Sequence, residues 1–330
     1  MIIYSENQPP LLSDYGIEIP MLKTRAERIR SEILKNFGKS VFCLRGPRKL
    51  NNTDLTRAHS LEFIANCETN PIAVVEQTFE LKDATGNYHR YSPGKATKAL
   101  SELVALYKES CELSYLCLEE AKKNEFAYYL GGGFHHSLST QGRGFCLFND
   151  IMIAARKFQA DIENKPIWII DIDAHKGCGT AEIAQSDHSI HTLSIHMSKG
   201  WPLDSESHDK NGKLNPWFIP STIDIGINSG EEDLYLDKLT TGLEQLEFKA
   251  KELPALCIVV DGSDPYEGDA LPSSSLLKLT KEQCLQRNLI VYDFLKKRNI
   301  PQAYLMSGGY GDKNWIIHYQ FIEEILNRRK

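Results

Sequence analysis

The sequence predicts an α/β fold with a central, largely parallel sheet, and three observations support this prediction. Short apolar runs rich in Val, Ile and Leu recur along the chain, as expected for strands that are buried on both faces. Amphipathic segments with helical spacing separate most of these runs. Clusters of glycine and polar residues follow several runs directly, at the position where open parallel sheets bind ligands.

The expected strands are the apolar runs that end in glycine or polar clusters. In chain order they are residues 72–79, 126–130, 167–173, 191–196, 222–227, 256–261 and 303–307. Helical spacing predicts a helix or helix pair within 95–123 and further helices within 150–162, 233–253 and 281–299. Asn149 and Asp150 are suitable N-caps for the helix that follows them.

Length and composition indicate one globular domain over residues 1–330. Of the 330 residues, 42% are hydrophobic and 25% are charged, and neither a linker nor an internal repeat stands out. The polar stretch 204–216 predicts a long loop, and ordered loops of this length are often functional. We therefore expect a single α/β catalytic domain rather than two domains.

Charge and cysteine usage narrow the function classes. The net charge of −6 gives no sign of a nucleic-acid surface and is compatible with a cationic substrate. The chain start resembles no signal peptide, and no apolar run reaches the roughly 18 residues of a membrane span. None of the eight cysteines forms a CxxC pair, which indicates free thiols and predicts a cytoplasmic location.

The DIDAH motif is the first candidate metal site. Asp171, Asp173 and His175 are spaced at i, i+2 and i+4, so all three point to one side if the chain stays extended. The alternative is a solvated strand end with one buried histidine. Catalytic zinc typically has three protein ligands and an open position, and Asp264 in GSD is the candidate third ligand, although it also fits an ordinary turn. Oxygen and imidazole ligands suit Zn²⁺, Fe²⁺ or Mn²⁺.

Two further motifs carry chemistry-bearing residues. GGGFHH places His135 and His136 on an expected loop, where two imidazoles can face one point; the alternative is that one ring packs and the other meets water. SGGYGD places Tyr310 beyond Gly308 and Gly309, whose backbone freedom allows a sharp turn. The phenol is a candidate donor to an oxyanion, or else an ordinary surface tyrosine.

The motifs GGGFHH, GFCLFND, IIDIDAHKGCGT, DGSDPYEGD and SGGY, in this order, resemble the zinc-dependent histone deacetylase family. The resemblance runs from about residue 97 to the C-terminus and is weaker before it, and GGGFHH, IIDIDAH and EGD look most similar to the class IV branch. It implies an arginase-type three-layer α/β/α fold, a catalytic zinc with Fe²⁺ as the alternative, and a structural potassium ion. It also implies hydrolytic removal of acetyl or longer acyl groups from lysine side chains or similar amines. From charge and hydropathy we expect no nucleic-acid or membrane partner.

The resemblance implies a role for each matching residue. The residues matching the zinc ligands are Asp173, His175 and Asp264. The residues matching the catalytic groups are His135, His136, Tyr310 and Asp171, in which Asp171 orients His135, His136 is the general base and Tyr310 polarises the carbonyl. The potassium ion would bind oxygen atoms of Asp171, Asp173, His175 and residues near Ser194 and Ile195. The tunnel for the acyl-lysine would be lined by Gly144, Phe145, Gly308 and Gly309.

Two positions depart from the family pattern. Cys178 stands where the family usually has Asp or Asn behind the second histidine, and a thiol is a poor hydrogen-bond acceptor. This departure puts the orientation and basicity of His136 in question. His196 and residues 197–202 also differ from the usual aromatic tunnel wall, and Trp201 is the candidate replacement.

Several functions remain open on the sequence alone. One is an acetylpolyamine or small-amide hydrolase of the same family, and another is a catalytically weak acyl-lysine binder, which only Cys178 supports. A ureohydrolase with two Mn²⁺ ions is disfavoured because Lys176, Gly177 and Cys178 provide no carboxylate after His175. Oligomeric state and preferred acyl length are not encoded in any pattern that we recognise.

Overall fold

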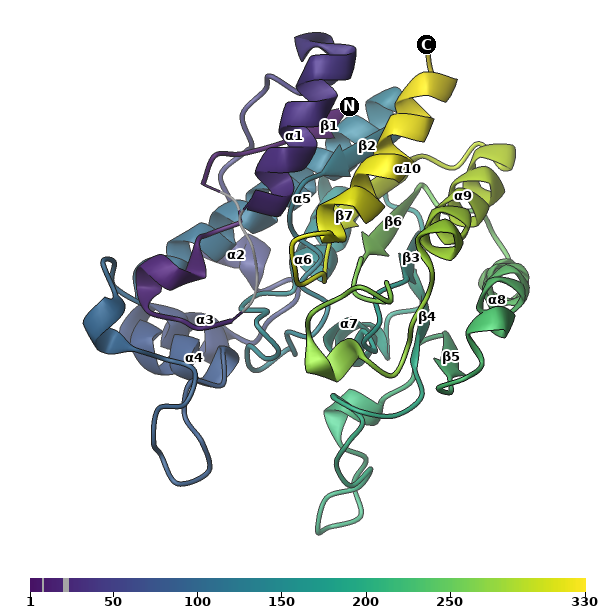
Figure 1. Ribbon diagram of the computed structural model, residues 1–330. Helices are drawn as coiled ribbons and strands as arrows, with labels where there is room; N and C mark the ends of the chain where they lie inside the picture. The colour runs from purple at the N-terminus through teal and green to yellow at the C-terminus, as the bar shows by residue number, and fades with distance from the viewer. Residues whose placement is uncertain (8, 20–23) are drawn as a thin grey trace.

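The structure is a computed structural model that describes residues 1–7, 9–19 and 24–330. A seven-stranded sheet lies between two layers of helices (Figure 1). The strands are β1 (Ile2–Ile3), β2 (Phe126–Tyr129), β3 (Ile167–Asp171), β4 (Ile190–Met197), β5 (Ile223–Ile227), β6 (Leu256–Asp261) and β7 (Gln302–Met306). Their order is β1-β2-β7-β6-β3-β4-β5, and every neighbouring pair is parallel.

The helices form separate layers on the two faces of the sheet. One layer contains α1 (Thr24–Phe37), α8 (Tyr235–Ala250), α9 (Lys281–Lys297) and α10 (Asn314–Arg328). The other contains α2 (Asn52–Leu55), α3 (Leu61–Thr69), α4 (Pro71–Thr78), α5 (Glu102–Asn124), α6 (Asp150–Asp161) and α7 (Cys178–Ala184). Successive strand residues alternate between the layers, as Tyr128 and Tyr129 do. The predicted three-layer fold with a parallel sheet is confirmed.

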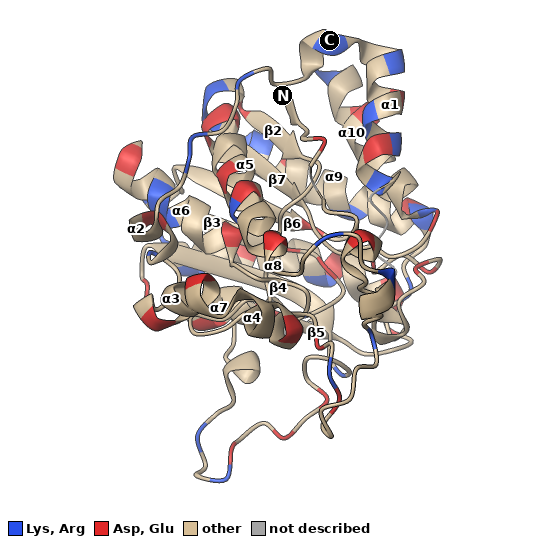
Figure 2. Cartoon of the chain, turned by 90° about the vertical axis from the view of Figure 1, so that its left-hand side faces the viewer, with Lys and Arg blue, Asp and Glu red and all other residues tan. Residues whose placement is uncertain are grey.

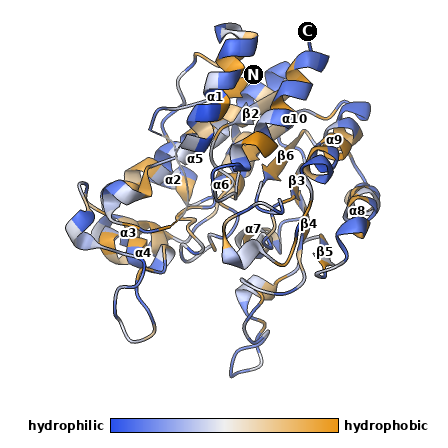
Figure 3. Cartoon of the chain, viewed as in Figure 1, coloured by the Kyte–Doolittle hydropathy of each residue, from blue (hydrophilic) through white to orange (hydrophobic). Residues whose placement is uncertain are grey.

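Burial on both faces explains why the strands read as continuous apolar runs. The residues of β2, β3, β6 and β7 are all buried. In Figure 3, β6 is largely orange, whereas α9 and α10 carry both orange and blue residues, as helices with one buried side do. Lysine, arginine and acidic residues are interspersed along outer helices such as α1 (Figure 2). In the described parts of the chain, every helix is too short or too polar to cross a membrane.

One predicted strand is wrong. Residues 72–79 fall almost entirely within α4, which begins with Pro71 in the first turn and buries Val74, Val75 and Thr78. Proline is favoured at a helix start because its missing N–H would have no partner there. An apolar run of this length fits a buried helix as well as a strand, so periodicity alone does not separate them.

The other predicted elements occur, with differences at their ends. The helix expected within 95–123 begins only at Glu102, and the helix expected from residue 150 forms with Asn149 as its N-cap, accepting from the Met152 N–H. The expected strand 167–173 ends at Asp171. Beyond it the chain turns, and the carboxylate of Asp173 accepts from the His175 N–H at 3.0 Å. The extended backbone, which was the condition for Asp171, Asp173 and His175 to point to one side, therefore ends at Asp171.

The sheet order explains how distant motifs meet. GGGFHH follows β2, DIDAH begins in β3, GSD follows β6 and SGGY follows β7. These strands occupy consecutive positions β2-β7-β6-β3 in the sheet. Because all are parallel, their carboxyl ends lie at the same edge, where such sheets bind ligands. The four motifs therefore lie side by side.

Candidate metal centre and catalytic site

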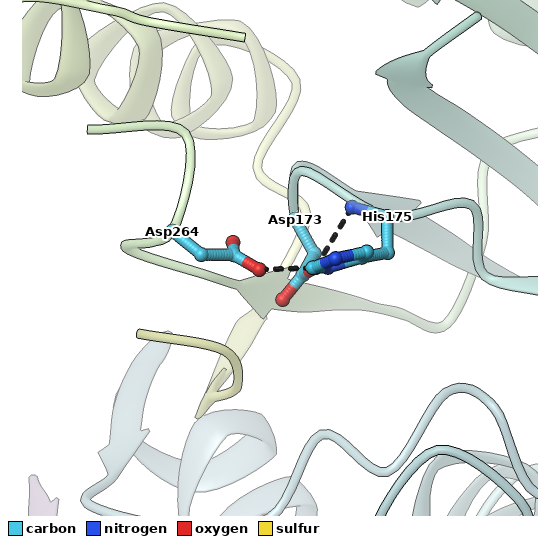
Figure 4. Close-up of side chains that lie close together, drawn as sticks. All are labelled: Asp173, His175 and Asp264. Atoms are coloured by element: carbon cyan, nitrogen blue, oxygen red, sulfur yellow. Dashed lines mark hydrogen bonds and ion pairs between the residues drawn. The ribbon is translucent and has the colours of Figure 1, made fainter. Parts of the chain in front are cut away.

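Asp173, His175 and Asp264 converge on one buried point (Figure 4). Their ligand atoms all lie within 4.8 Å of one another. His175 Nδ1 lies 2.9 Å from Asp264 Oδ2 and 3.2 Å from Asp173 Oδ1. Although DIDAH is not extended, the turn after β3 brings the two predicted ligands of this motif together with the predicted ligand after β6.

The electrostatics of this cluster favour a cation. Burial would lower the pKa of His175, but hydrogen bonds to Asp173 and Asp264 outweigh it and raise this pKa to about 10. Burial and, after it, the neighbouring charge of Asp173 raise the pKa of Asp264 to about 7. Positive charge at the meeting point thus relieves the repulsion between two buried carboxylates.

The donor set fits a divalent metal ion. Carboxylate and imidazole groups are ligands of zinc and related metals, and three protein ligands leave a further position open, as in catalytic sites. His175 Nε2 lies 3.3 Å from Ser273 Oγ, so the other ring nitrogen, Nδ1, is left as the ligand atom. Asp173, His175 and Asp264 would hold the ion, and neither carboxylate is exposed by more than 1%.

His135 is held by its predicted carboxylate. Its Nδ1 lies 2.7 Å from Asp171 Oδ2, and its Nε2 lies 3.7 Å from Asp173 Oδ1. Burial would lower the pKa of His135, but the charges of Asp171 and Asp173 outweigh it and raise this pKa to about 9. His135 is therefore suited to carry positive charge beside the metal centre.

His136 has a very different environment. Its ring centroid lies 3.9 Å from that of His135, yet its Nδ1 faces Cys178 Sγ at 3.4 Å. Burial lowers the pKa of His136 well below its usual range, and the nearby charges of His135 and His175 lower it further. The tandem histidines are thus electrostatically unequal, with a charged His135 and a neutral His136.

The loop that carries these histidines is fixed by the start of α6. The buried Asp150 carboxylate accepts from the Gly133 and Phe134 N–H groups at 2.9 and 2.7 Å. Asn149 donates to the Ser137 carbonyl at 3.1 Å, on the other side of the histidine pair. The helix start therefore holds the loop before and after the two rings.

A third buried histidine supports the same loop. His59, in the turn between α2 and α3, lies with Nδ1 3.0 Å from the Leu138 carbonyl. Its Nε2 accepts from the Asn149 N–H at 2.9 Å. These two contacts require a neutral ring with the proton on Nδ1. Burial lowers the pKa of His59 to about 4, which keeps the ring neutral at ordinary pH.

Tyr310 is positioned through its main chain. Its N–H donates to Asp269 Oδ2 at 2.7 Å, and its carbonyl accepts from the Ala270 N–H at 2.6 Å. The buried Arg25 of α1 donates to the carbonyls of residues 307, 308 and 309 at 2.7 to 3.0 Å. The turn before Tyr310 is therefore held from two sides, by α1 and by the EGD segment.

Two adjoining cavities meet at this cluster. The outer cavity, of about 420 Å³, is lined by Phe145, Trp201 and Tyr310 among others and opens past Glu18, Glu80, Arg90 and Asp204. The inner cavity, of about 60 Å³, is lined by the glycines after β2, the tandem histidines, and Gly308, Gly309 and Tyr310. Both include Gly144 and Phe145, the predicted tunnel residues. Gly308 and Gly309 lie on the inner cavity and do not line the outer one.

Trp201, the candidate replacement for the aromatic wall of the tunnel, lies beside His136 and His175. Its ring centroid is 4.5 Å from that of His136 and 5.7 Å from that of His175. The Arg143 guanidinium lies 5.1 Å from the Trp201 ring and 4.2 Å from the Trp217 ring, so a cation is stacked between two indoles. The long loop expected over 204–216 thus begins at the outer cavity, which Asp204 lines, and ends next to Trp217, which contacts Arg143.

His196 takes no part in either cavity. It is buried, and its Nε2 lies 2.7 Å from Asp224 Oδ1. Lys176, also buried, pairs with the other oxygen of the same carboxylate. The residue that departs from the family pattern on β4 therefore belongs to a separate ion-pair cluster between β4, β5 and the loop after β3.

The expected potassium ligands lie around the ends of β3 and β4. Asp171 pairs with Ser194 in the sheet register, and Ser194 Oγ accepts from the Gly177 N–H at 3.4 Å. Among the described residues, no donor reaches the main-chain oxygens of Asp173 and His175. Main-chain carbonyl oxygens beside a carboxylate are ligands that hard metal cations bind. Potassium, with Ile195 as a further ligand, stays a prediction.

Several residues that support the site were not recognised in that role from the sequence. Arg25 and His59 lie in the first sixty residues, where the family resemblance is weak, and their partners are distant main-chain groups. Asp150 and Asp269 lie inside the quoted GFCLFND and EGD motifs. The acidic residues that close these two motifs were therefore readable as candidates for support of the site.

A parallel three-layer fold with an Asp–His–Asp cluster at its strand ends defines the arginase and deacetylase class of proteins. The family model of the histone deacetylase domain matches residues 19–320. The chain therefore belongs to the histone deacetylase domain family.

Individual relatives agree with this assignment. The chain is 30% identical over 195 residues to Histone deacetylase 2 of Arabidopsis thaliana, which covers 59% of this chain and 47% of that protein. It is 24% identical over 308 residues to Histone deacetylase 1 of Homo sapiens, covering 91% of this chain and 59% of that protein. The chain thus spans about half to three fifths of the length of these relatives.

The fold also matches a solved structure of an acetylpolyamine aminohydrolase from Burkholderia pseudomallei. The TM-score is 0.69 and the sequence identity 17%, and the match covers 98% of this chain and 98% of that one. At this identity the match supports the arginase-type fold and leaves the substrate of the present chain undetermined.

Proposed function

We propose that the chain is a metal-dependent amide hydrolase that removes acyl groups from lysine side chains or similar amines. The observation that carries this proposal is the meeting of three ligand residues, two histidines and a tyrosine where the outer and inner cavities adjoin. A divalent metal ion, for which we propose Zn²⁺, would supply Lewis acidity toward the amide carbonyl and toward water.

The residues of the chain divide the remaining chemistry. His136 is neutral and accepts the proton of the attacking water as general base. His135, held by Asp171, carries positive charge and stabilises the developing negative charge. Tyr310 donates its phenol proton to the oxyanion, and the two-sided support of its backbone fixes that position. The amine would leave through the outer cavity.

The mouth of the outer cavity favours a substrate that carries further positive charge. Glu18, Glu80 and Asp204 line it. Glu18 is paired with Lys95 at 2.8 Å and Glu80 with Arg90 at 2.9 Å, so Asp204 is the carboxylate of this set that has no ion pair among the described residues. A basic peptide with an acyl-lysine fits this charge pattern. An acylated polyamine fits it as well and is our second candidate substrate.

The test is turnover of a panel of acylated amines by the metal-loaded protein. The panel contains acyl-lysine peptides of increasing acyl length and acetylpolyamines. We expect Tyr310→Phe and His136→Ala to lose about 10²- to 10³-fold in turnover with full metal content. Tyr88→Phe and His208→Ala change exposed residues and serve as controls. Wild-type rates in both site variants would refute the assigned roles.

A further inference from the structure

The loop between β4 and β5 carries Trp201 near its start and Trp217 near its end, and it projects from the body of the molecule (Figure 1). Among the described residues, every hydrogen bond of residues 201–217 is made within the segment 200–219. No hydrogen bond therefore ties this loop to the sheet or to the long helices, and side-chain packing must fix its position.

The guanidinium of Arg143 contacts both ends of the loop. It lies 5.1 Å from the Trp201 ring and 4.2 Å from the Trp217 ring, within the range of about 6 Å for cation–π attraction. Its Nη1 is buried without a hydrogen-bond partner, and no carboxylate in the described part of the chain pairs with it. The two indole rings therefore take the place of an acidic partner for this cation.

Trp217 is held independently of Arg143. Its indole N–H donates to Ser205 Oγ at 2.8 Å, and the single-turn helix Pro216–Phe218 packs against α7. Trp201 makes no comparable side-chain hydrogen bond within the described residues. Because the rings of Trp201 and Trp217 are not in contact with each other, the guanidinium is what connects the anchored indole to the other one.

Trp201 in turn packs on the catalytic groups. It meets the His136 ring edge-on at 4.5 Å and lies 5.7 Å from the His175 ring. The backbone of Gly144 is so close that an added Cβ would overlap the indole. Main-chain hydrogen bonds of 2.9 and 3.0 Å between Arg143 and Cys146 close the turn that contains Gly144. One short turn thus lines the outer cavity and carries the cation that contacts Trp201.

We propose that Arg143 is a positioning residue, whose guanidinium links Trp201 to Trp217 and thereby holds Trp201 against His136 as a wall of the outer cavity. The inference rests on the proposed function, in which the amine part of the substrate occupies that cavity. Arginine suits this role because its guanidinium is planar, weakly hydrated and able to stack on aromatic rings, whereas the compact ammonium of lysine is strongly hydrated.

The cavity linings indicate which kinetic constant depends on this link. Trp201 lines the outer cavity, whereas Arg143 and Trp217 line neither cavity. Neither of the two can therefore touch a substrate that lies in the cavities. Their loss should weaken substrate binding through Trp201 and leave the groups that perform the chemistry in place.

The direct test is ¹⁹F NMR of protein labelled with 5-fluorotryptophan, which gives one resonance for each of the four tryptophans. Trp201→Phe and Trp217→Phe assign two of them. In Arg143→Met and in Trp217→Leu, we expect the Trp201 resonance to move toward the shift of free 5-fluorotryptophan, because a mobile ring averages its surroundings. Arg143→Lys keeps the charge and should give an intermediate shift. Arg30→Met removes a matched contact with the Tyr4 ring, outside both cavities, and should change nothing.

Steady-state kinetics on an acyl-lysine peptide provides the second test. Arg143→Met and Trp217→Leu should each raise KM about tenfold and leave kcat within about twofold, because a binding wall is lost and the catalytic groups remain. In a Trp201→Ala background, neither substitution should have a further effect. A merely destabilised fold would instead lower the apparent kcat at an unchanged KM.

The outcomes separate the two proposals. A Trp201 resonance that does not move in Trp217→Leu, or an unchanged KM in Arg143→Met, would overturn the role of Arg143. Absence of turnover on every acylated amine would overturn the proposed function instead. The fluorine measurement requires no substrate, so it decides whether Arg143 holds Trp201 in either case.

Discussion

His59 makes the stability of the chain depend on pH in a way that one substitution tests. The ring is 3% exposed and binds the Leu138 carbonyl through Nδ1 and the Asn149 N–H through Nε2. A proton added to Nε2 would make this nitrogen a donor, and it would then face the Asn149 N–H, which is also a donor. Its neighbouring rings are Phe63 and Phe148, which offer no charge that would compensate.

The magnitude follows from the pKa of about 4, against an ordinary value of 6.5. Because the folded pKa is depressed, the stabilisation is full above pH 6.5 and is lost as the pH falls toward 4. A shift of this size corresponds to about 3 kcal/mol in total, of which about 2 kcal/mol disappears between about pH 7 and about pH 5.

The assay is urea unfolding of the wild type and His59→Gln at both pH values. Glutamine does not titrate and keeps an acceptor for the Asn149 N–H but loses the bond to Leu138, so the variant should be about 1–2 kcal/mol less stable at neutral pH. At about pH 5 the two proteins should become nearly equal, since only the wild type loses the contribution of His59. A constant gap at both pH values would refute the reasoning. His208→Gln, at an exposed histidine, should follow the wild-type curve.

Three other predictions concern the support of the site and its metal. Asp150→Asn should lower the free energy of urea unfolding by about 1–3 kcal/mol, because one loop N–H then faces an amide donor, while Asp237→Asn on the exposed side of α8 should have little effect. Asp269→Asn should reduce kcat at least about tenfold with little change in KM, because the Tyr310 N–H loses its carboxylate acceptor; steady-state kinetics measures both. Chelation of the metal should lower the melting temperature of the protein. At a free metal concentration one hundredfold above Kd, binding stabilises the fold by about 2.7 kcal/mol, and chelation removes this contribution. Asp264→Asn should abolish the difference in melting temperature between chelated and metal-loaded protein.

The fold was readable because buried parallel strands leave a strong signal. The runs at 256–261 and 303–307 match β6 and β7 within a residue, since a strand covered on both faces has no polar side to interrupt it. The run at 72–79 failed for the same reason, because a short buried helix such as α4 shows an identical composition. Strand β1 has only two residues, which is too short for any periodic pattern.

The candidate site was readable only where its residues are chemically unusual. Carboxylates and histidines directly after apolar strands stand out, so Asp173, His175 and Asp264 could be grouped before their geometry was known. Arg25 gave no such signal, because it binds main-chain carbonyls that lie 282 to 284 residues away along the chain. Every residue type has a main-chain carbonyl, so such a hydrogen-bond partner cannot be recognised from the sequence.

These supporting residues explain how loops without regular structure form a fixed site. Each of the four site loops is held by a buried polar side chain from a different helix. Asp150 of α6 holds the loop after β2, Arg287 of α9 donates to a carbonyl in the turn after β3, Asn314 of α10 donates to the loop after β6, and Arg25 of α1 holds the loop after β7. Each main-chain group so paired would otherwise be buried without a partner, at a cost of about 1–3 kcal/mol. Loss of one such side chain should therefore loosen its own loop, and with it the proposed chemistry, while the sheet beneath stays folded.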